Sequence, residues 1–316
     1  MSVDKALELR SFLQGMPETL AIAEAVLDVW PGHASYLLKG MQARSDAILR
    51  ATEVAAAASR RLMAGEEPRF AADYRWTCDR LRDEELFFHR EGRYRLGSFS
   101  EAWREVYSDH QYMARYVNGL LLSQFLWYNH AATFEMFLNR VIAVASEDFD
   151  YLEVGPGHGL MVYFAAQAFR ARTLEAWDVS EVSLRDTAAA LDQLAIKRPV
   201  ALRQIDILNA GEPERRFDLI VISEVLEHLE DPGAALSFLR LALRPCGRIF
   251  VNVPLNSPSP DHIFLLESPE QARGLAEAAG FRIETMELFA TQGARIDRAL
   301  ANRVSVSVGM ILTVGT

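Results

Sequence analysis

The segment SEVLEHLEDP, residues 223–232, carries the side chains best suited to chemistry. Glu224, Glu227 and His228 stand at i, i+3 and i+4, directly after a run of β-branched and aliphatic residues. In a helical turn this spacing places all three on one side. Two carboxylates and one imidazole are suitable ligands for a divalent cation. The pattern thus predicts a polar cluster at the end of a strand.

His262, in the segment VPLNSPSPDHIF, follows the next apolar run, so its loop is expected to cross the same edge. We predict Glu224, Glu227, His228 and His262 as ligands of Mg²⁺ or a transition-metal dication, which would lower the pKa of an acceptor oxygen. Glu227, His228 and His262 are also the predicted catalytic residues. Two alternatives stay open, because acidic residues favour the first turn of an ordinary helix and His262 could be a general base or a surface loop residue.

Short apolar strands alternate with helix-length segments from Asp148 onward. The predicted strands are 151–154, 173–178, 200–206, 219–223, 248–253, 282–289 and 304–314, and the predicted helices lie near 160–170, 181–194, 232–243 and 269–279. This alternation indicates an α/β fold with a mostly parallel sheet and a ligand site at the carboxyl ends of its strands.

The first predicted strand ends in LEVGPGHG, where three alternate glycines allow a sharp turn and close approach to a ligand. A bare structural turn would have the same glycines. Asp178 ends the second strand, and Asp206 and Ile207 end the third. Asp178 alone could also serve as a helix N-cap.

Together, ExGxGxG and the acidic ends of the second and third strands resemble the class I S-adenosylmethionine-dependent methyltransferases over about residues 148–290. The resemblance implies a Rossmann-like, seven-stranded sheet whose last strand is inserted antiparallel. It also implies a cofactor site with the methionine portion on Glu153 and the glycine loop, the ribose on Asp178, the adenine between Asp206 and Ile207, and one edge at the end of the fourth strand. The predicted cofactor-binding residues are Glu153, Gly155, Gly157, Gly159, Asp178, Asp206, Ile207, Ser223 and Glu224.

The residue at the position of the general base differs from that in one branch of this family. In dimeric O-methyltransferases, a VLHxWxD segment supplies a histidine base after the fourth strand; aligned on Val225, Leu226 and Asp231, that position is Glu227 here. The ExxEH pattern with a later DH instead resembles metal-dependent 2′-O-methyltransferases of small-RNA 3′ ends and, more loosely, the ubiquinone-biosynthesis O-methyltransferases.

Residues 1–146 show helical spacing, and residues 147–316 form the predicted methyltransferase domain. One β-prone stretch, FFHREGRYRLG (87–97), predicts a small hairpin. The N-terminal part resembles the winged-helix-like dimerisation domains of two-domain small-molecule O- and C-methyltransferases, which implies a homodimer and a lid over the substrate. The segment 117–139 is predicted to be one helix that lines the acceptor pocket with Trp127, Tyr128 and His130.

The composition and net charge of the chain limit the partners and classes of function that we expect. The 316-residue chain has a net charge of −10, which argues against nucleic acid as the main partner. Cys78 and Cys246 show no ligand spacing, and polar residues interrupt the most apolar stretch, so we expect a cytoplasmic protein without a membrane segment. We predict methyl transfer to a hydroxyl, enol or α-keto-acid carbon of a small metabolite in specialised (natural-product) metabolism. The alternatives are an RNA 3′-end 2′-O-methyltransferase and a non-catalytic cofactor-binding regulator.

Overall fold

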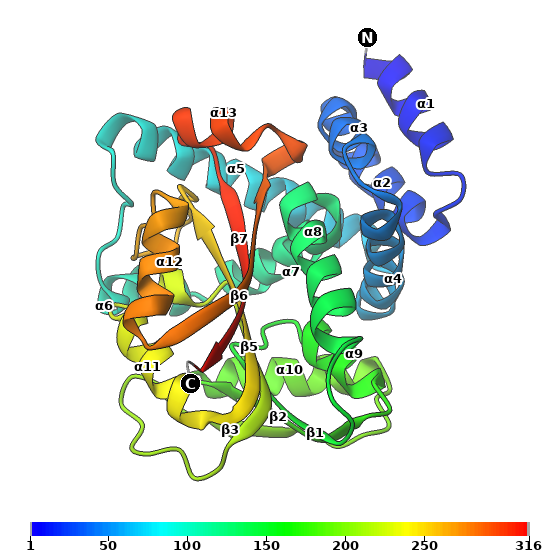
Figure 1. Cartoon of the computed structure of the whole chain (residues 1–316). Coiled ribbons are helices and arrows are strands. Elements are labelled where there is room, and N and C mark those ends of the chain that lie inside the picture. The colour runs from blue at the N-terminus through cyan, green and yellow to red at the C-terminus, as the bar shows by residue number, and fades with distance from the viewer. Residues whose placement is uncertain (1, 315–316) are drawn as a thin grey trace.

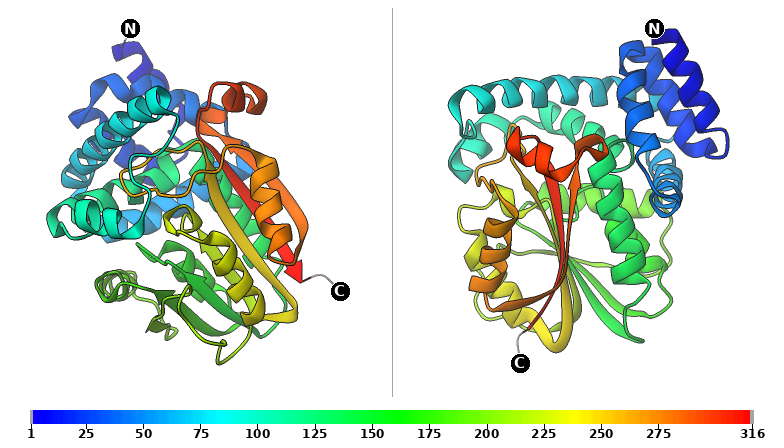
Figure 2. Two further views of the ribbon diagram at one scale, coloured as in Figure 1. Left: turned by 90° about the vertical axis from the view of Figure 1, so that its left-hand side faces the viewer. Right: turned by 45° about the horizontal axis from the view of Figure 1, so that its top comes forward.

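The computed structural model describes residues 2–314, and its first half is helical (Figure 1). The helices before the sheet are α1 (Ser2–Phe12), α2 (Pro17–Val29), the 3₁₀ turn η1 (Pro31–His33), α3 (Ala34–Gln42), α4 (Asp46–Met63), α5 (Glu67–Glu91), α6 (Phe99–Ala102), the π-helical turn η2 (Trp103–Tyr107), α7 (His110–Leu126), α8 (Tyr128–Met136) and the π-helical turn η3 (Phe137–Ile142). The first four helices gather at one end of the molecule, and α5 extends from them across its top (Figure 2).

The second half alternates strands and helices. Its elements are β1 (Phe149–Val154), α9 (Leu160–Gln167), β2 (Ala171–Asp178), α10 (Glu181–Gln193), β3 (Ala201–Gln204), β4 (Phe217–Ser223), the 3₁₀ turn η4 (Leu226–His228), α11 (Pro232–Ala242), β5 (Leu243–Leu255), α12 (Pro269–Ala278), β6 (Phe281–Ala290), the 3₁₀ turn η5 (Thr291–Gly293), α13 (Ile296–Ala301) and β7 (Val306–Val314). The seven strands form one sheet in the order β3-β2-β1-β4-β5-β7-β6. The first five pair in parallel, and β7 pairs antiparallel with β5 and β6, which confirms the predicted fold class.

The central strands β1 and β4 are buried on both faces of the sheet, and their successive residues point to opposite sides. Tyr151 and Leu219 pack in a core shared with α1–α5 and α7–α10, whereas Leu152 and Ile220 pack in a second core with α11 and α12. The N-terminal helices therefore share the first core with one face of the sheet. Whether residues 1–146 and 147–316 behave as separate domains stays a prediction.

The predicted hairpin at 87–97 is wrong. Helix α5 continues to Glu91, and Gly92 (φ 73°) ends it in the left-handed conformation, its N–H donating to the Phe88 carbonyl at 2.8 Å. The Glu-Gly pair is therefore a helix C-cap and not a hairpin turn. No strand precedes β1 within residues 2–314, so the hairpin on which the winged-helix resemblance mainly rested does not form.

The predicted helix over 117–139 is also interrupted. Trp127 adopts an extended conformation (φ −89°, ψ 136°) between α7 and α8. The buried Arg44 guanidinium donates to the carbonyls of Phe125 (2.7 Å) and Leu126 (3.0 Å) at this break. These bonds satisfy carbonyl groups that the end of α7 leaves without intrahelical partners.

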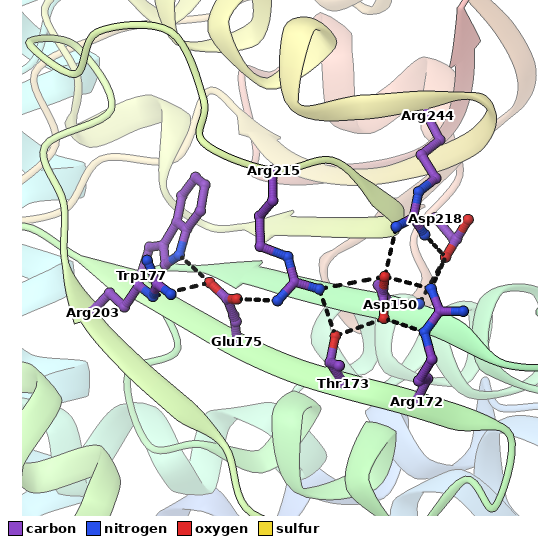
Figure 3. A network of polar contacts seen from close by, with 9 residues as sticks. All are labelled: Asp150, Arg172, Thr173, Glu175, Trp177, Arg203, Arg215, Asp218 and Arg244. Atoms are coloured by element: carbon purple, nitrogen blue, oxygen red, sulfur yellow. Dashed lines mark hydrogen bonds and ion pairs between the residues drawn. The ribbon is translucent and has the colours of Figure 1, made fainter.

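An ion-pair network joins the amino ends of the strands (Figure 3). The Asp150 carboxylate at the start of β1 is 3% exposed and pairs with Arg172 on β2 (2.6 Å), Arg244 on β5 (2.7 Å) and Arg215 before β4 (3.4 Å). Arg215 also pairs with Glu175 of β2 at 2.7 Å. Because this network lies at the edge opposite the strand carboxyl ends, it holds the strands together without occupying the site.

Candidate active site

The glycine loop after β1 is built on left-handed backbone. Gly155, Gly157 and Gly159 have φ values of 68°, 51° and 74°, which side-chain-bearing residues adopt reluctantly. At Gly155 a Cβ atom would lie 2.5 Å from a methyl group of Val225. Gly159 is the N-cap of α9. The loop therefore presents backbone to the space above β1.

Glu153 lies just before this loop and is buried. Its Oε2 accepts a hydrogen bond from the Tyr151 hydroxyl at 2.8 Å. Burial raises the pKa of Glu153 to about 8, against the opposing effect of that hydrogen bond. A cationic ligand group beside it would restore its charge.

The predicted ribose and adenine contacts lie at the ends of β2 and β3. Asp178 accepts hydrogen bonds from the Ser180 N–H and the Ser183 hydroxyl, both at 2.8 Å, and burial raises its pKa. Asp206 accepts from the Leu208 N–H at 2.9 Å. Both aspartates thus brace the turns that follow their strands, and Ile207 is buried. A carboxylate oxygen can accept a second hydrogen bond, so neither arrangement prevents a ligand contact.

A cavity of about 180 Å³ opens beside the glycine loop at the ends of β1, β4 and β5. The predicted residues that line it are Trp127, His130, Glu153, Gly155, Gly157, Ser223, Glu224, Glu227, His228 and His262. The predicted residues that do not line it are Tyr128, Gly159, Asp178, Asp206 and Ile207. The structure therefore joins the predicted methionine, catalytic and acceptor residues in one space.

Tyr128 lies elsewhere because it follows the break at Trp127. Its ring packs near Gly293 and beside Ile48 and Ala131. Arg115 and Arg295, whose charge could in principle hold an acceptor carboxylate, are each paired with an aspartate, Arg115 with Asp73 (3.0 Å) and Arg295 with Asp297. The side of the cavity predicted to bind the acceptor is instead lined by Leu81, Tyr116, Leu120, Gln124, Trp127 and His130.

His130 and the glycine-loop His158 both face the cavity. Burial lowers the pKa of each to about 4, and His158 further lowers that of His130. The His130 Nδ1 lies 3.1 Å from the Ser123 hydroxyl. Both imidazoles are therefore neutral near pH 7 and can form hydrogen bonds without adding charge.

Three of the residues that line the cavity, Glu227, His228 and His262, converge. One ligand atom from each lies within 4.8 Å of the others. Glu227 Oε1 is 4.0 Å from His228 Nε2 and 3.9 Å from His262 Nε2. Glu227 is 1% exposed, and both of its carboxylate oxygens lack a hydrogen-bond partner. Three potential ligands thus surround one point.

The second nitrogens of both rings are engaged on the far side. His262 Nδ1 lies 2.6 Å from the Ser257 carbonyl, and His228 Nδ1 lies 3.1 Å from the Asp261 carbonyl. A carbonyl only accepts, so each Nδ1 carries the proton and each Nε2 offers a lone pair toward Glu227. The two Nε2 atoms and the Glu227 carboxylate thus offer lone pairs toward one point, which suits a divalent cation.

Glu224 takes a different course from the one predicted. Its backbone is left-handed (φ 53°), and its N–H donates to the Asn252 carbonyl at 3.0 Å. Its Oε1 accepts from Asn252 Nδ2 at 2.8 Å. Glu224 therefore leans on β5 at the cavity wall and does not belong to the three-residue cluster. Burial and then the charge of Glu224 raise the pKa of Glu227 well above its ordinary value.

Sequence reasoning missed two residues beside the cluster. Tyr107 lies on η2 and Asp261 directly precedes His262; the Tyr107 hydroxyl is 3.2 Å from both His228 Nδ1 and Asp261 Oδ2. The DH pair was visible in the sequence, but Asp261 was given no role. No sequence pattern marked Tyr107.

Fold and site together define a Rossmann-like methyltransferase. The family described as "Methyltransferase domain" matches residues 126–286. The chain belongs to this family, and the predicted class I S-adenosylmethionine-dependent methyltransferase resemblance is confirmed. The match begins at the end of α7 and ends within β6, so it includes Glu227, His228 and His262.

Named relatives are similar over a shorter part of the chain. A ubiquinone biosynthesis O-methyltransferase from Alkalilimnicola ehrlichii is 31% identical over 120 residues, which are 38% of this chain and 47% of that protein. The protein of the same name from Pseudomonas syringae pv. tomato is 32% identical over 108 residues, 34% of this chain and 45% of that protein. The chain thus spans about half the length of these relatives.

The solved structure of a mitomycin 7-O-methyltransferase superposes with a TM-score of 0.52 at 14% identity, covering 79% of this chain and 71% of that one. This likeness shows the fold alone. Within residues 2–314, no helix is long and apolar enough to cross a membrane.

Proposed function

We propose that the protein transfers the methyl group of S-adenosylmethionine to a hydroxyl oxygen of a small metabolite, with a divalent cation held by Glu227, His228 and His262. The observation that carries the proposal is the cluster of Glu227, His228 and His262. It lines the same cavity as the glycine loop. The relatives are named as O-methyltransferases, which supports oxygen as the acceptor atom over an enol or α-keto-acid carbon.

The sulfonium of the cofactor supplies an activated methyl group, so the protein needs mainly to align the acceptor and exclude water. The glycine loop and Glu153 bind the methionine end of the cofactor. Trp127 and Gln124 cover the acceptor from α7 and the break that follows it. Glu227, His228 and His262 orient the acceptor oxygen, and a bound cation would lower the pKa of that hydroxyl. Positioning of this kind lowers a barrier by about 7–11 kcal/mol in well-oriented cases.

The competing explanation for the unpartnered Glu227 carboxylate is a proton. A neutral, protonated Glu227 would also reduce the cost of burial. The two explanations differ in one measurable property, because only a metal site binds Co²⁺ or Mn²⁺ with defined stoichiometry and loses activity in a chelator.

The test combines metal binding with methyl transfer from labelled S-adenosylmethionine to a panel of small phenols, hydroxy acids and enols. We expect one Co²⁺ per chain, and Glu227→Gln and His262→Ala should each lower turnover at least about 100-fold. His89→Ala, which changes an exposed histidine on α5, is the control and should retain full activity. Wild-type turnover in the two site variants would remove both residues from the mechanism.

Two further predictions depend on other assays. A homodimer and a role in specialised metabolism follow from the family resemblance, and sedimentation tests the first. Binding of RNA in a low-salt shift assay would favour the RNA 3′-end alternative, against which the net charge of −10 argues. Cofactor binding without transfer to any acceptor would favour the regulatory alternative.

A further inference from the structure

A buried hydroxyl and carboxylate network surrounds the far side of the proposed catalytic cluster. Its centre is Asp261, whose side chain is 6% exposed. Asp261 Oδ1 lies within hydrogen-bond distance of Ser259 Oγ (2.9 Å) and of the Tyr116 hydroxyl (3.0 Å). Asp261 Oδ2 accepts from the Tyr107 hydroxyl at 3.2 Å. The Ser259 and Tyr116 hydroxyls also contact each other, so one of them donates to the other, and the remaining proton of this pair and that of Tyr107 hold the carboxylate in place.

The donors come from distant parts of the chain. Tyr107 ends the π-helical turn η2 and Tyr116 lies on α7, both in the N-terminal helices, whereas Asp261 lies on the loop after β5. Tyr116 is 2% exposed. π-Helical turns are often found at functional sites, because they shift one side chain out of helical register. The N-terminal helices thus reach the loop that carries His262.

Proton counting fixes the direction of each bond around His228. The Tyr107 hydroxyl has one proton, and the Asp261 carboxylate is a stronger acceptor than a neutral imidazole nitrogen. Tyr107 therefore donates to Asp261 Oδ2 and accepts from His228 Nδ1–H at 3.2 Å. The Asp261 carbonyl (3.1 Å) and its Oδ2 (3.5 Å) face the same Nδ1. Every neighbour of Nδ1 in this network is an acceptor.

We propose that Asp261 is a positioning residue for His228, and that Tyr107 and Tyr116 of the N-terminal helices set it in place. The arrangement holds the Nδ1–H tautomer and aims the His228 Nε2 lone pair toward Glu227. Carboxylates that orient metal-ligating or basic histidines in this way are known to matter nearly as much as the histidine itself. The inference rests on the proposed function for the use of Nε2, but the tautomer itself can be measured without any reaction.

The first experiment reads the tautomer directly. Long-range ¹H–¹⁵N correlation spectra of histidine-labelled protein, with His228 assigned by its loss in His228→Gln, show which ring nitrogen bears the proton. We expect Nδ1–H in the wild type. Asp261→Asn should give a mixture of tautomers, because the amide can donate to Nδ1. A wild-type His228 protonated on Nε2 would overturn the proposal.

The second experiment measures Co²⁺ affinity by its visible absorption and the affinity for S-adenosylhomocysteine by calorimetry. Asp261→Asn and the double variant Tyr107→Phe/Tyr116→Phe should each weaken Co²⁺ binding about 10- to 100-fold and leave nucleoside binding within twofold. Tyr112→Phe removes a hydroxyl from the same helix as Tyr116 and should change neither. A change below threefold in both site variants would refute the positioning role.

The two readouts separate this inference from the proposed function. If the wild type binds no Co²⁺, the metal part of the proposed function fails, and the tautomer spectra alone decide whether Asp261 positions His228. If Asp261→Asn does not fold, the tyrosine variants carry the test, because each keeps its ring and loses only a hydroxyl. Unchanged spectra in those variants, with an unchanged Co²⁺ affinity, would then refute it.

Discussion

Glu153 gives the sharpest thermodynamic prediction, because its buried carboxyl has a pKa of about 8 against an ordinary value of 4.5. In the unfolded chain the group ionises near its ordinary value, so between pH 4.5 and 8 the folded state binds more protons. The contribution of Glu153 to the free energy of unfolding is therefore highest below pH 4.5 and falls as the pH rises toward 8. At pH 7 the interval is two and a half pH units at about 1.36 kcal/mol each, or about 3 kcal/mol.

Replacing Glu153 with glutamine removes this loss. We expect Glu153→Gln to raise the free energy of unfolding of the cofactor-free protein by about 3 kcal/mol at pH 7 and to have almost no effect near pH 4. Urea unfolding at both pH values measures the difference, and Glu214→Gln, at a side chain that is 87% exposed, is the control. A variant whose stability relative to the wild type is the same at both pH values would refute the reasoning.

The same carboxyl predicts proton release when the cofactor binds. The family resemblance places the methionine portion beside Glu153, and its ammonium group would lower the pKa of that carboxyl. At pH 7 we expect close to one proton to leave per cofactor bound by the wild type and none by Glu153→Gln. Calorimetry in two buffers of different ionisation enthalpy counts these protons, and equal counts for the two proteins would place the ammonium elsewhere.

Three other substitutions test separate parts of the fold and site. Asp178→Asn should weaken S-adenosylhomocysteine binding at least about tenfold by calorimetry, since a buried charged acceptor is worth about 1.5–3 kcal/mol; unchanged affinity would contradict the ribose contact. Asp150→Ala should lower the free energy of unfolding by about 1.5–3 kcal/mol, because its partly exposed arginine partners can still be solvated, whereas Glu284→Ala, which breaks an exposed pair, should cost at most about 1 kcal/mol. Gly155→Ala should abolish cofactor binding, because its Cβ would lie 2.5 Å from the Val225 side chain; wild-type affinity would show that the loop can move.

The central strands of the sheet could be predicted from sequence because they are buried on both faces. Runs such as LIVIS, in β4, are continuously apolar and β-branched, and helical segments of the right length separate them. Every predicted strand overlaps an observed one, and their differences are a few residues at the ends. The antiparallel β7 followed from the family pattern and from no local feature.

The N-terminal part could not be predicted as well, because its local signals have two meanings. The Glu91-Gly92 pair is typical of a hairpin turn, yet it also ends helices. Phe88 is fully buried at the end of α5, and the guanidinium of Arg303, from near the end of the chain, lies 4.6 Å above its ring. These tertiary contacts favour the helix, and no pattern within 87–97 reveals them.

In the site, too, the strand topology was predicted correctly and the local backbone conformation was not. His262 was placed near Glu227 because consecutive parallel strands end at one edge, and the N–H groups of Ile263 and Phe264 do donate to the Glu227 carbonyl at 2.9 and 3.0 Å. Glu224 was placed by helical spacing, which fails because its left-handed backbone turns it onto β5 before the 3₁₀ turn begins. Strand order therefore brought distant residues together correctly, whereas helical spacing did not predict the position of Glu224, because the residue types do not indicate its left-handed backbone.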